Sequence, residues 1–77
     1  MSNILSDIII AIKDSVDDAE AKIISSAIYA GNPSALISFN SKSQRIFLVR
    51  FDPEIDTPQS ILEAARSVRP DAVMAGG

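Results

Sequence analysis

The chain has 77 residues, and it contains neither cysteine nor histidine. A chain of this length builds one hydrophobic core, and a hydrophobic content of 47% is typical of a folded domain. The missing residue types exclude a thiolate nucleophile, an imidazole base, and zinc, haem or iron–sulfur ligation by cysteine or histidine. The formal net charge of −3 argues against a nucleic-acid surface, which requires clustered lysine and arginine.

The first third of the chain is expected to form a strand and then a helix. Consecutive aliphatic residues at 8–12 predict a buried strand. Ser15 is the expected N-cap of the helix, with Asp18 three residues later in a loose capping box. Gly31 is expected in the left-handed conformation that ends a helix, and Pro33 prevents continuation. The expected apolar face of the helix consists of Val16, Ala19, Ile23, Ile24, Ala27 and Ile28.

One alternative places a single long helix over the same region. Apolar residues between Leu5 and Ile23 recur at spacings of four and three, which also fits a helix from Ile4 to Tyr29. Three consecutive isoleucines and the cap signal at 14–15 favour the strand followed by a helix.

The middle of the chain has the pattern of a β-hairpin. Segments 35–39 and 45–51 alternate apolar and other residues on either side of a polar turn at 40–44. One face is strongly apolar, and we assign its residues to the core rather than to a base-stacking platform. These residues are Phe47, Val49 and Phe51.

A second helix and a closing strand complete the predicted elements. Thr57 is the expected N-cap, with Pro58 at the first helical position, where its missing N–H costs nothing. Pro70 ends the helix, and residues 71–75 form a short strand. The expected buried side of this helix consists of Ile61, Leu62, Ala65 and Val68.

The order strand, helix, strand, strand, helix, strand is that of ferredoxin-like folds. We therefore predict an α+β domain with a four-stranded antiparallel sheet and two helices on one face. The whole chain, 1–77, is one domain with its core at about 8–75. The mixed face of the hairpin indicates that the other face of the sheet is partly open.

The segment Ile46–Pro53, followed by Thr57–Ala65, resembles heavy-metal-associated domains, in which the third strand ends in aromatic-Asp-Pro and the second helix opens with proline. The resemblance spans about 8–74. Members that bind copper(I), zinc or cadmium hold the ion between the cysteines of a Cys-x-x-Cys motif before the first helix. Those positions fall on Asp17 and Glu20, so the thiolate-based transfer of soft metals is not carried over.

The resemblance and the missing cysteines imply a non-enzymatic binding or regulatory module, with no cofactor and no catalytic residue. We expect it to contact a protein partner or itself, or to be the N-terminal domain of a transport-related protein. The expected partner-binding residues are Asp14, Asp18, Arg45 and Arg50. No serine has a base partner, which argues against nucleophilic catalysis.

The alternative function is metal binding or metal delivery, with Asp17 and Glu20 as ligands. Carboxylate oxygens suit hard cations such as Mg²⁺, Ca²⁺ and Mn²⁺. The competing interpretation is that these acids only stabilise the start of the helix.

A cytoplasmic location without membrane insertion is expected for this chain. The first residues lack the basic stretch of a signal peptide. The apolar run 8–12 is also far shorter than the ~20 residues of a membrane helix.

Overall fold

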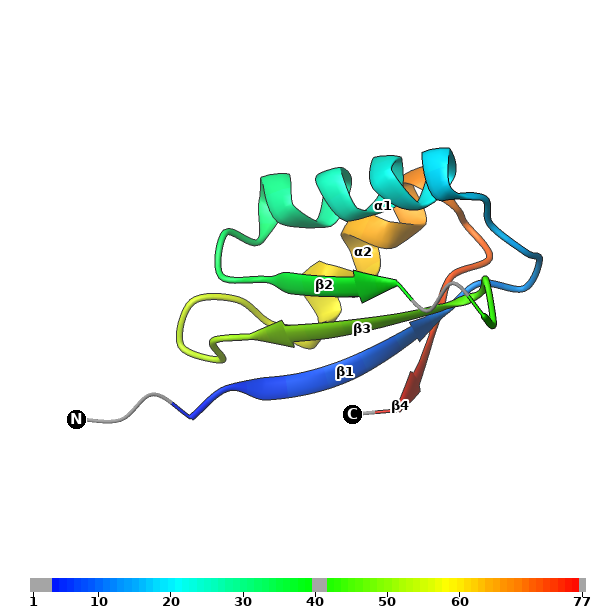
Figure 1. The fold of residues 1–77 in the computed structure, drawn as a ribbon. Helices are drawn as coiled ribbons and strands as arrows, with labels where there is room; N and C mark the ends of the chain where they lie inside the picture. Colours follow the sequence, from blue (N-terminus) through cyan, green and yellow to red (C-terminus); the bar gives the residue numbers. More distant parts are fainter. Residues whose placement is uncertain (1–3, 40–41, 77) are drawn as a thin grey trace.

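Four strands and two helices follow one another in the order βαββαβ in the computed structural model, which describes residues 4–39 and 42–76. The strands form one antiparallel sheet in the order β2-β3-β1-β4. Both helices lie on the same face of this sheet (Figure 1). The elements are β1 (Ser6–Ala11), α1 (Asp18–Gly31), β2 (Leu36–Phe39), β3 (Ile46–Phe51), α2 (Pro58–Val68) and β4 (Val73–Gly76). This arrangement confirms the predicted α+β class and the ferredoxin-like topology.

The strand β1 lies in the middle of the sheet, between β3 and β4. Ser6 pairs with Phe51 and Ala11 with Ile46, so the whole of β1 is hydrogen-bonded to β3. The alternative of one long helix from Ile4 to Tyr29 is therefore wrong, because its first part pairs as a strand. A run of β-branched residues packs well on a pleated surface, which explains this preference.

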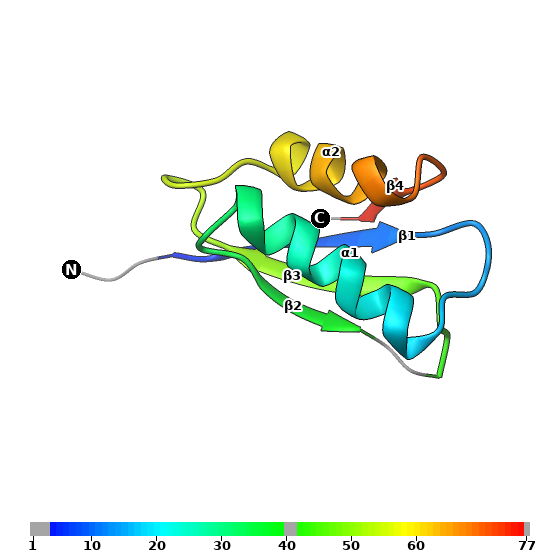
Figure 2. The same ribbon diagram turned by 90° about the horizontal axis from the view of Figure 1, so that it is seen from above.

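The hydrophobic core lies between the sheet and the two helices. In the view from above, α1 runs over the β2 side and α2 over the β4 side (Figure 2). Alternate residues of β1 and β3 point into this layer and are almost completely buried, as the period of two along a strand requires. They are Ile8, Ile10, Phe47, Val49 and Phe51. The assignment of the three β3 residues to the core is confirmed.

The first helix begins later than its sequence signals predict. Ser15 is not the N-cap, because the N-cap is Asp17, whose carboxylate accepts the N–H of Glu20 at 2.8 Å. The N–H of Val16 donates to the carbonyl of Gln44 at 2.7 Å, and the Val16 side chain is buried. This long-range bond ties the chain at Val16 to the hairpin turn, so the helix starts only after it.

The buried face of α1 is also rotated from the predicted one. The buried residues are Ala21, Ile24 and Ile28, whereas Ala19 is exposed and Ile23 is 58% exposed. The helix packs against α2 as well as over the sheet, and this double contact selects the stripe that faces inward. The prediction for Ala19 and Ile23 is wrong, and that for Ile24 and Ile28 is confirmed.

The end of α1 uses a side chain in place of the expected left-handed glycine. Gly31 is the last helical residue, and its φ is not positive. Asn32 caps the helix instead, because its buried side-chain amide donates to the carbonyl of Ile28 at 3.0 Å. The backbone N–H of Asn32 donates to Tyr29. A polar side chain therefore performs the function that the sequence assigned to the glycine.

The start of α2 agrees with the prediction. Thr57 is the N-cap, its hydroxyl accepts the N–H of Ser60 at 3.1 Å, and Pro58 is the first helical residue. Ile61 and Ala65 are buried, while the other two predicted residues pack against the core as half-buried side chains. Of the predicted turn at 40–44, residues 40 and 41 lie outside the described part of the chain.

Candidate functional site

The loop between β1 and α1 is the place where the resemblance would put a metal ion. Asp17 is committed to the helix as its N-cap, through the 2.8 Å bond from the N–H of Glu20. The Glu20 carboxylate lies further along the helix and accepts a hydrogen bond from Arg69 Nη1 at 3.1 Å. The two positions therefore serve as a helix cap and as an ion-pair partner. This donor set does not fit the soft metals of the family, which require thiolates.

Arg69 is the centre of an ion-pair network at this end of the molecule. Its guanidinium donates through Nε and Nη2 to the two carboxylate oxygens of Asp71, each at 3.1 Å. Besides Glu20, Asp14 lies 4.0 Å from Nη2. The Asp71 carboxylate also accepts the backbone N–H of Lys13 at 3.1 Å. The network thus connects the β1–α1 loop, α1 and the turn before β4.

The two-point contact between Arg69 and Asp71 shifts the pKa values of both groups. Hydrogen bonds from Arg69 lower the pKa of Asp71, and the same bonds raise the pKa of Arg69. The Arg69 side chain is only 18% exposed, so it is less screened by water than a typical surface arginine. Within residues 4–39 and 42–76, no group of three acidic side chains is placed to hold a metal ion. The positive charge that faces Asp14, Glu20 and Asp71 is that of the Arg69 guanidinium.

The four residues expected to bind a partner lie on different surfaces. Asp14 is exposed next to Arg69, and Arg45 lies nearby, donating to the carbonyl of Lys13 at 3.3 Å. Asp18 begins α1 and lines a hollow beside β2. Arg50 lies toward the other end of β3, where it pairs with Asp7. The structure therefore does not bring the four together as one site.

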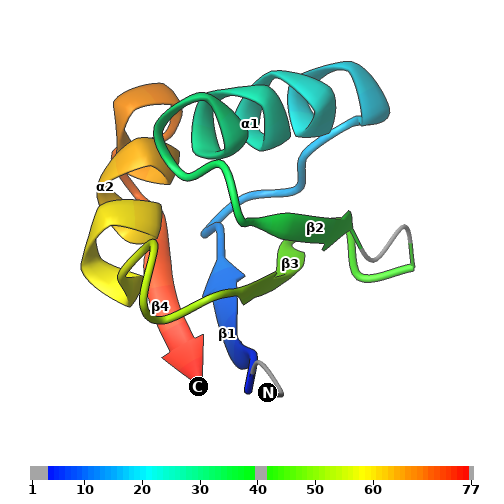
Figure 3. The same cartoon turned by 90° about the vertical axis from the view of Figure 1, so that its left-hand side faces the viewer.

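The face of the sheet opposite the helices is the first of two surfaces that no described element covers. Figure 3 shows both helices on one side of the sheet, and no described element covers the other side. Several large aliphatic residues on this side are well exposed: Leu36 by 62%, Leu48 by 41% and Val73 by 48%. We define the open face by the residues that alternation and register place there: Asp7, Ile9, Ala11, Leu36, Ser38, Ile46, Leu48, Arg50 and Val73.

The strand register arranges the open face in rows. Leu48 lies between Ile9 of β1 and Ser38 of β2, so the centre of the face is mainly aliphatic. In the next row, Asp7 lies opposite Arg50, whose Nε donates to the carboxylate at 2.9 Å. This bond lowers the pKa of Asp7. A shallow hollow of about 260 Å³ lies between the edge strand β2 and its neighbour β3 on this face.

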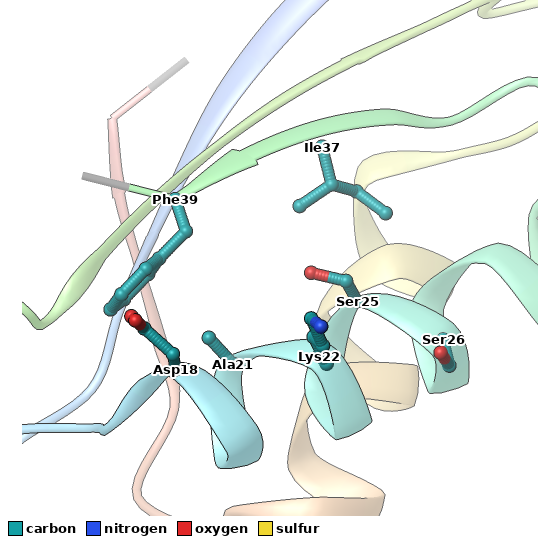
Figure 4. Close-up of a pocket in the computed structure, with 7 residues that line it drawn as sticks. All are labelled: Asp18, Ala21, Lys22, Ser25, Ser26, Ile37 and Phe39. Atoms are coloured by element: carbon teal, nitrogen blue, oxygen red, sulfur yellow. The ribbon is translucent and has the colours of Figure 1, made fainter. Parts of the chain in front are cut away.

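The second surface is a groove between α1 and β2, with a volume of about 500 Å³. Its floor is apolar, with Ile37 and Phe39 projecting from β2 toward the helix (Figure 4). The helix side consists of Asp18, Ala21, Lys22, Ser25 and Ser26. In Figure 4, Asp18 and Ala21 lie toward the Phe39 end of the groove and Ser25 toward the Ile37 end. The ring of Phe39 rests against that of Phe47, with centroids 4.9 Å apart.

No family model, curated protein or solved structure matches this chain. No helix in the described ranges is long and apolar enough to cross a membrane. The longest, α1, has 14 residues.

Sequence reasoning missed two polar networks. Arg69 was not among the residues expected to form a site, and the Arg-Pro-Asp sequence at 69–71 was the one local signal available for its pairing with Asp71. Sequence reasoning also missed Asp56, which is buried and accepts both the N–H and the hydroxyl of Ser34. The Ser34 hydroxyl in turn accepts the N–H of Asp52 at 3.0 Å. This second network ties the loop before β2 to the loop before α2.

Proposed function

We propose that this chain is a non-catalytic binding module that associates through its open face, and that the partner on this face is a second copy of the chain. The observation that carries the proposal is the exposure of Leu36, Leu48 and Val73 on one side of the sheet. Exposed aliphatic residues gathered on one face indicate an interaction surface, whereas scattered ones need no explanation.

The size of the open face is that of a weak dimer interface. The strands have 6, 6, 4 and 4 residues, so about 3.3 Å per residue and about 4.8 Å between strands give a flat footprint of roughly 320 Å². Covering this footprint on two copies removes at least about 640 Å² from water, which is typical of a weak and reversible contact. Two sheets packed face to face form a layer about 10 Å thick, as in β-sandwiches.

The charges on the open face support a copy of the same chain as the partner. A two-fold axis brings identical surfaces together, so every attractive contact must be self-complementary. Asp7 and Arg50 lie side by side on this face, one acidic and one basic. Across such an axis, each Arg50 can approach the partner's Asp7, and like charges need not meet. The central aliphatic row is self-complementary as well.

The resemblance to heavy-metal-associated domains supports the same proposal. We interpret the chain as a domain of this type whose metal loop now holds the Arg69 network, acting in the cytoplasm as a part of a transport-related protein. In such a protein the domain would act by contacting another chain and not by carrying a metal ion, because Asp17 caps α1 and Glu20 pairs with Arg69.

The test is the oligomeric state of a matched pair of variants. We expect sedimentation velocity to show a reversible dimer of the wild-type chain between about 10 μM and 1 mM, the range of modest interfaces. Leu48→Lys places a charge at the centre of the open face, and it should weaken the dimer at least about tenfold.

The control is Ile55→Lys, because Ile55 is exposed in the segment between β3 and α2. This variant should dimerise like the wild type. A chain that stays monomeric up to 1 mM, or an equal loss in both variants, overturns the proposal.

A further inference from the structure

The groove between α1 and β2 is separate from the open face, because Ile37 and Phe39 project toward the helices. Among the described strands, β2 pairs with β3 alone and forms one edge of the sheet. Alternate residues of an edge strand direct their backbone N–H and C=O groups away from the sheet, where another strand can pair with them. Strand addition at this edge is therefore independent of the proposed dimer.

The edge at β2 is short, but it lacks the other features that normally prevent strand addition. Besides being short, protected edges carry charged residues, proline or bulges. The residues of β2, Leu36–Phe39, include no charge and no proline, and their register with β3 is regular. The opposite edge strand, β4, is different, because its pairing with β1 shifts register between Ile9 and Ile10. The edge at β2 is thus the more suitable template.

The groove beside this edge can take an apolar side chain. A strand added to β2 directs every second side chain toward α1, on the same side as Ile37 and Phe39. Both residues are half-buried, and the volume of about 500 Å³ between them and the helix accommodates a branched aliphatic residue. Backbone pairing together with such a pocket is how strand-addition sites obtain affinity and specificity.

Two opposite charges flank this pocket on the helix. Asp18 and Lys22 are one helical turn apart, and both line the groove. Neither makes a hydrogen bond or ion pair through its side chain with any residue in 4–39 or 42–76. They are therefore free to pair with charges on a ligand.

We propose that the groove binds an extended segment of a partner protein, which adds to β2 as a fifth, antiparallel strand. The helix α1 runs from the Phe39 end of the groove to the Ile37 end, opposite in direction to β2. An antiparallel ligand therefore runs in the direction of α1 and meets Asp18 before Lys22. Charge complementarity then requires the order basic, apolar, acidic at every second residue of the ligand.

The spacing of the charges permits this order when the ligand side chains lean inward. Asp18 and Lys22 are about 6 Å apart along the helix axis. The two charged ligand residues are about 13 Å apart, because each is about 6.6 Å from the central apolar one. The long lysine and glutamate side chains of the ligand cover the difference of about 3.5 Å at each end.

A second copy of this chain is a poorer occupant of the groove. A two-fold axis at the middle of β2 would place the two α1 helices antiparallel, with Lys22 near the axis. Lys22 would then face the partner's Lys22, and like charges directly opposed disfavour the contact. A hetero-ligand with an acidic residue at this point meets no such repulsion.

The test is a titration with a defined peptide, acetyl-Thr-Lys-Thr-Val-Thr-Glu-Thr-amide, followed by amide NMR. We expect saturable shifts in β2 and in the groove-facing part of α1 at up to about 1 mM peptide, a concentration that detects weak binding. The control peptide exchanges lysine and glutamate, and it should bind at least about fivefold more weakly. Equal binding of the two peptides, or no shift in β2, overturns the proposal.

A variant pair separates recognition from unfolding. The double substitution Asp18→Lys with Lys22→Asp keeps the net charge and should reverse the preference between the two peptides. Glu63→Lys, at an exposed position on α2, should leave the preference unchanged. A double variant that retains the original preference overturns the proposal.

Repeating the titration on Leu48→Lys distinguishes the two proposals. The groove should bind the peptide equally well in this variant, whether or not the chain dimerises. A loss of peptide binding in this variant, with the fold retained, would contradict the independence of the two surfaces.

Discussion

The two faces of the sheet are built from alternate residues of the same strands, yet they meet different environments. Phe47 and Leu48 are neighbours on β3, and the first is fully buried whereas the second is 41% exposed. Both are large and apolar, so the difference comes from the helices, which cover only one face (Figure 3). The hydrophobicity of a strand residue therefore indicates that its burial would be favourable. Whether the residue is buried within one chain depends on which face of the sheet the helices cover.

The largest expected effect comes from truncating the covered face. Phe47→Ala should cost about 3–5 kcal/mol, which equals the stability available to a domain of this size and leaves the chain mainly unfolded. The adjacent Leu48→Ala should change monomer stability by no more than about 0.5 kcal/mol, as surface substitutions do. Urea denaturation followed by circular dichroism, at protein concentrations too low for dimers, measures both. Similar losses in the two variants would contradict the assignment of the faces.

The second effect concerns a polar group on the buried side. Asp56→Ala leaves the N–H and hydroxyl of Ser34 without their acceptor, and we expect a loss of about 1–3 kcal/mol in the free energy of unfolding. Asp7→Ala on the open face should cost less, because its partner Arg50 is exposed to water. Urea midpoints of the two variants at neutral pH give the comparison. A larger loss in Asp7→Ala would overturn it.

A third effect appears on acidification. Because Arg69 lowers the pKa of Asp71 in the folded state, the unfolded chain binds protons first as the pH falls. The stabilisation by this pair is complete above the ordinary aspartate pKa of about 3.9 and is lost as the pH falls through the lower, folded value. Arg69→Gln should flatten the loss of stability between about pH 5 and pH 2. Thermal unfolding across this range provides the measurement, and an unchanged slope would contradict the prediction.

The smallest effect is expected from the exposed ion pair on the open face. Arg50 also lowers the pKa of Asp7, but its side chain is more exposed than that of Arg69, so water and salt screen the pair. Arg50→Gln should therefore flatten the acid slope less than Arg69→Gln does. Added salt should reduce the difference between Arg50→Gln and the wild type. Equal acid slopes in the two arginine variants would contradict this order.

The fold could be predicted largely because its signals are local. The β-branched run before residue 12, the alternation in β3 and the Thr57-Pro58 cap each specify an element within a few residues. The start of α1 could not be predicted in this way. There, the bond from Val16 to Gln44 joins residues far apart in the chain and overrides the local preference of Ser15 for a cap.

The surfaces could be predicted only in outline. The mixed face of the hairpin indicated an open side of the sheet, and Leu36, Leu48 and Arg50 do lie there. The sequence did not indicate that Glu20 would be held by Arg69, because 49 positions separate them. Nor could it place Asp18 and Lys22 beside β2, since this depends on how α1 is rotated against the sheet.

The loop between β1 and α1 is held mainly by main-chain groups. The N–H of Ile12 donates to the Arg45 carbonyl at 2.9 Å, and the N–H of Val16 to that of Gln44 at 2.7 Å. The three side chains between them, at 13–15, are exposed. Since the course of the backbone depends little on what these three side chains are, the loop can tolerate exchange of residues 13–15 without loss of the fold. It is a natural place for evolution, or for a protein engineer, to graft a new specificity.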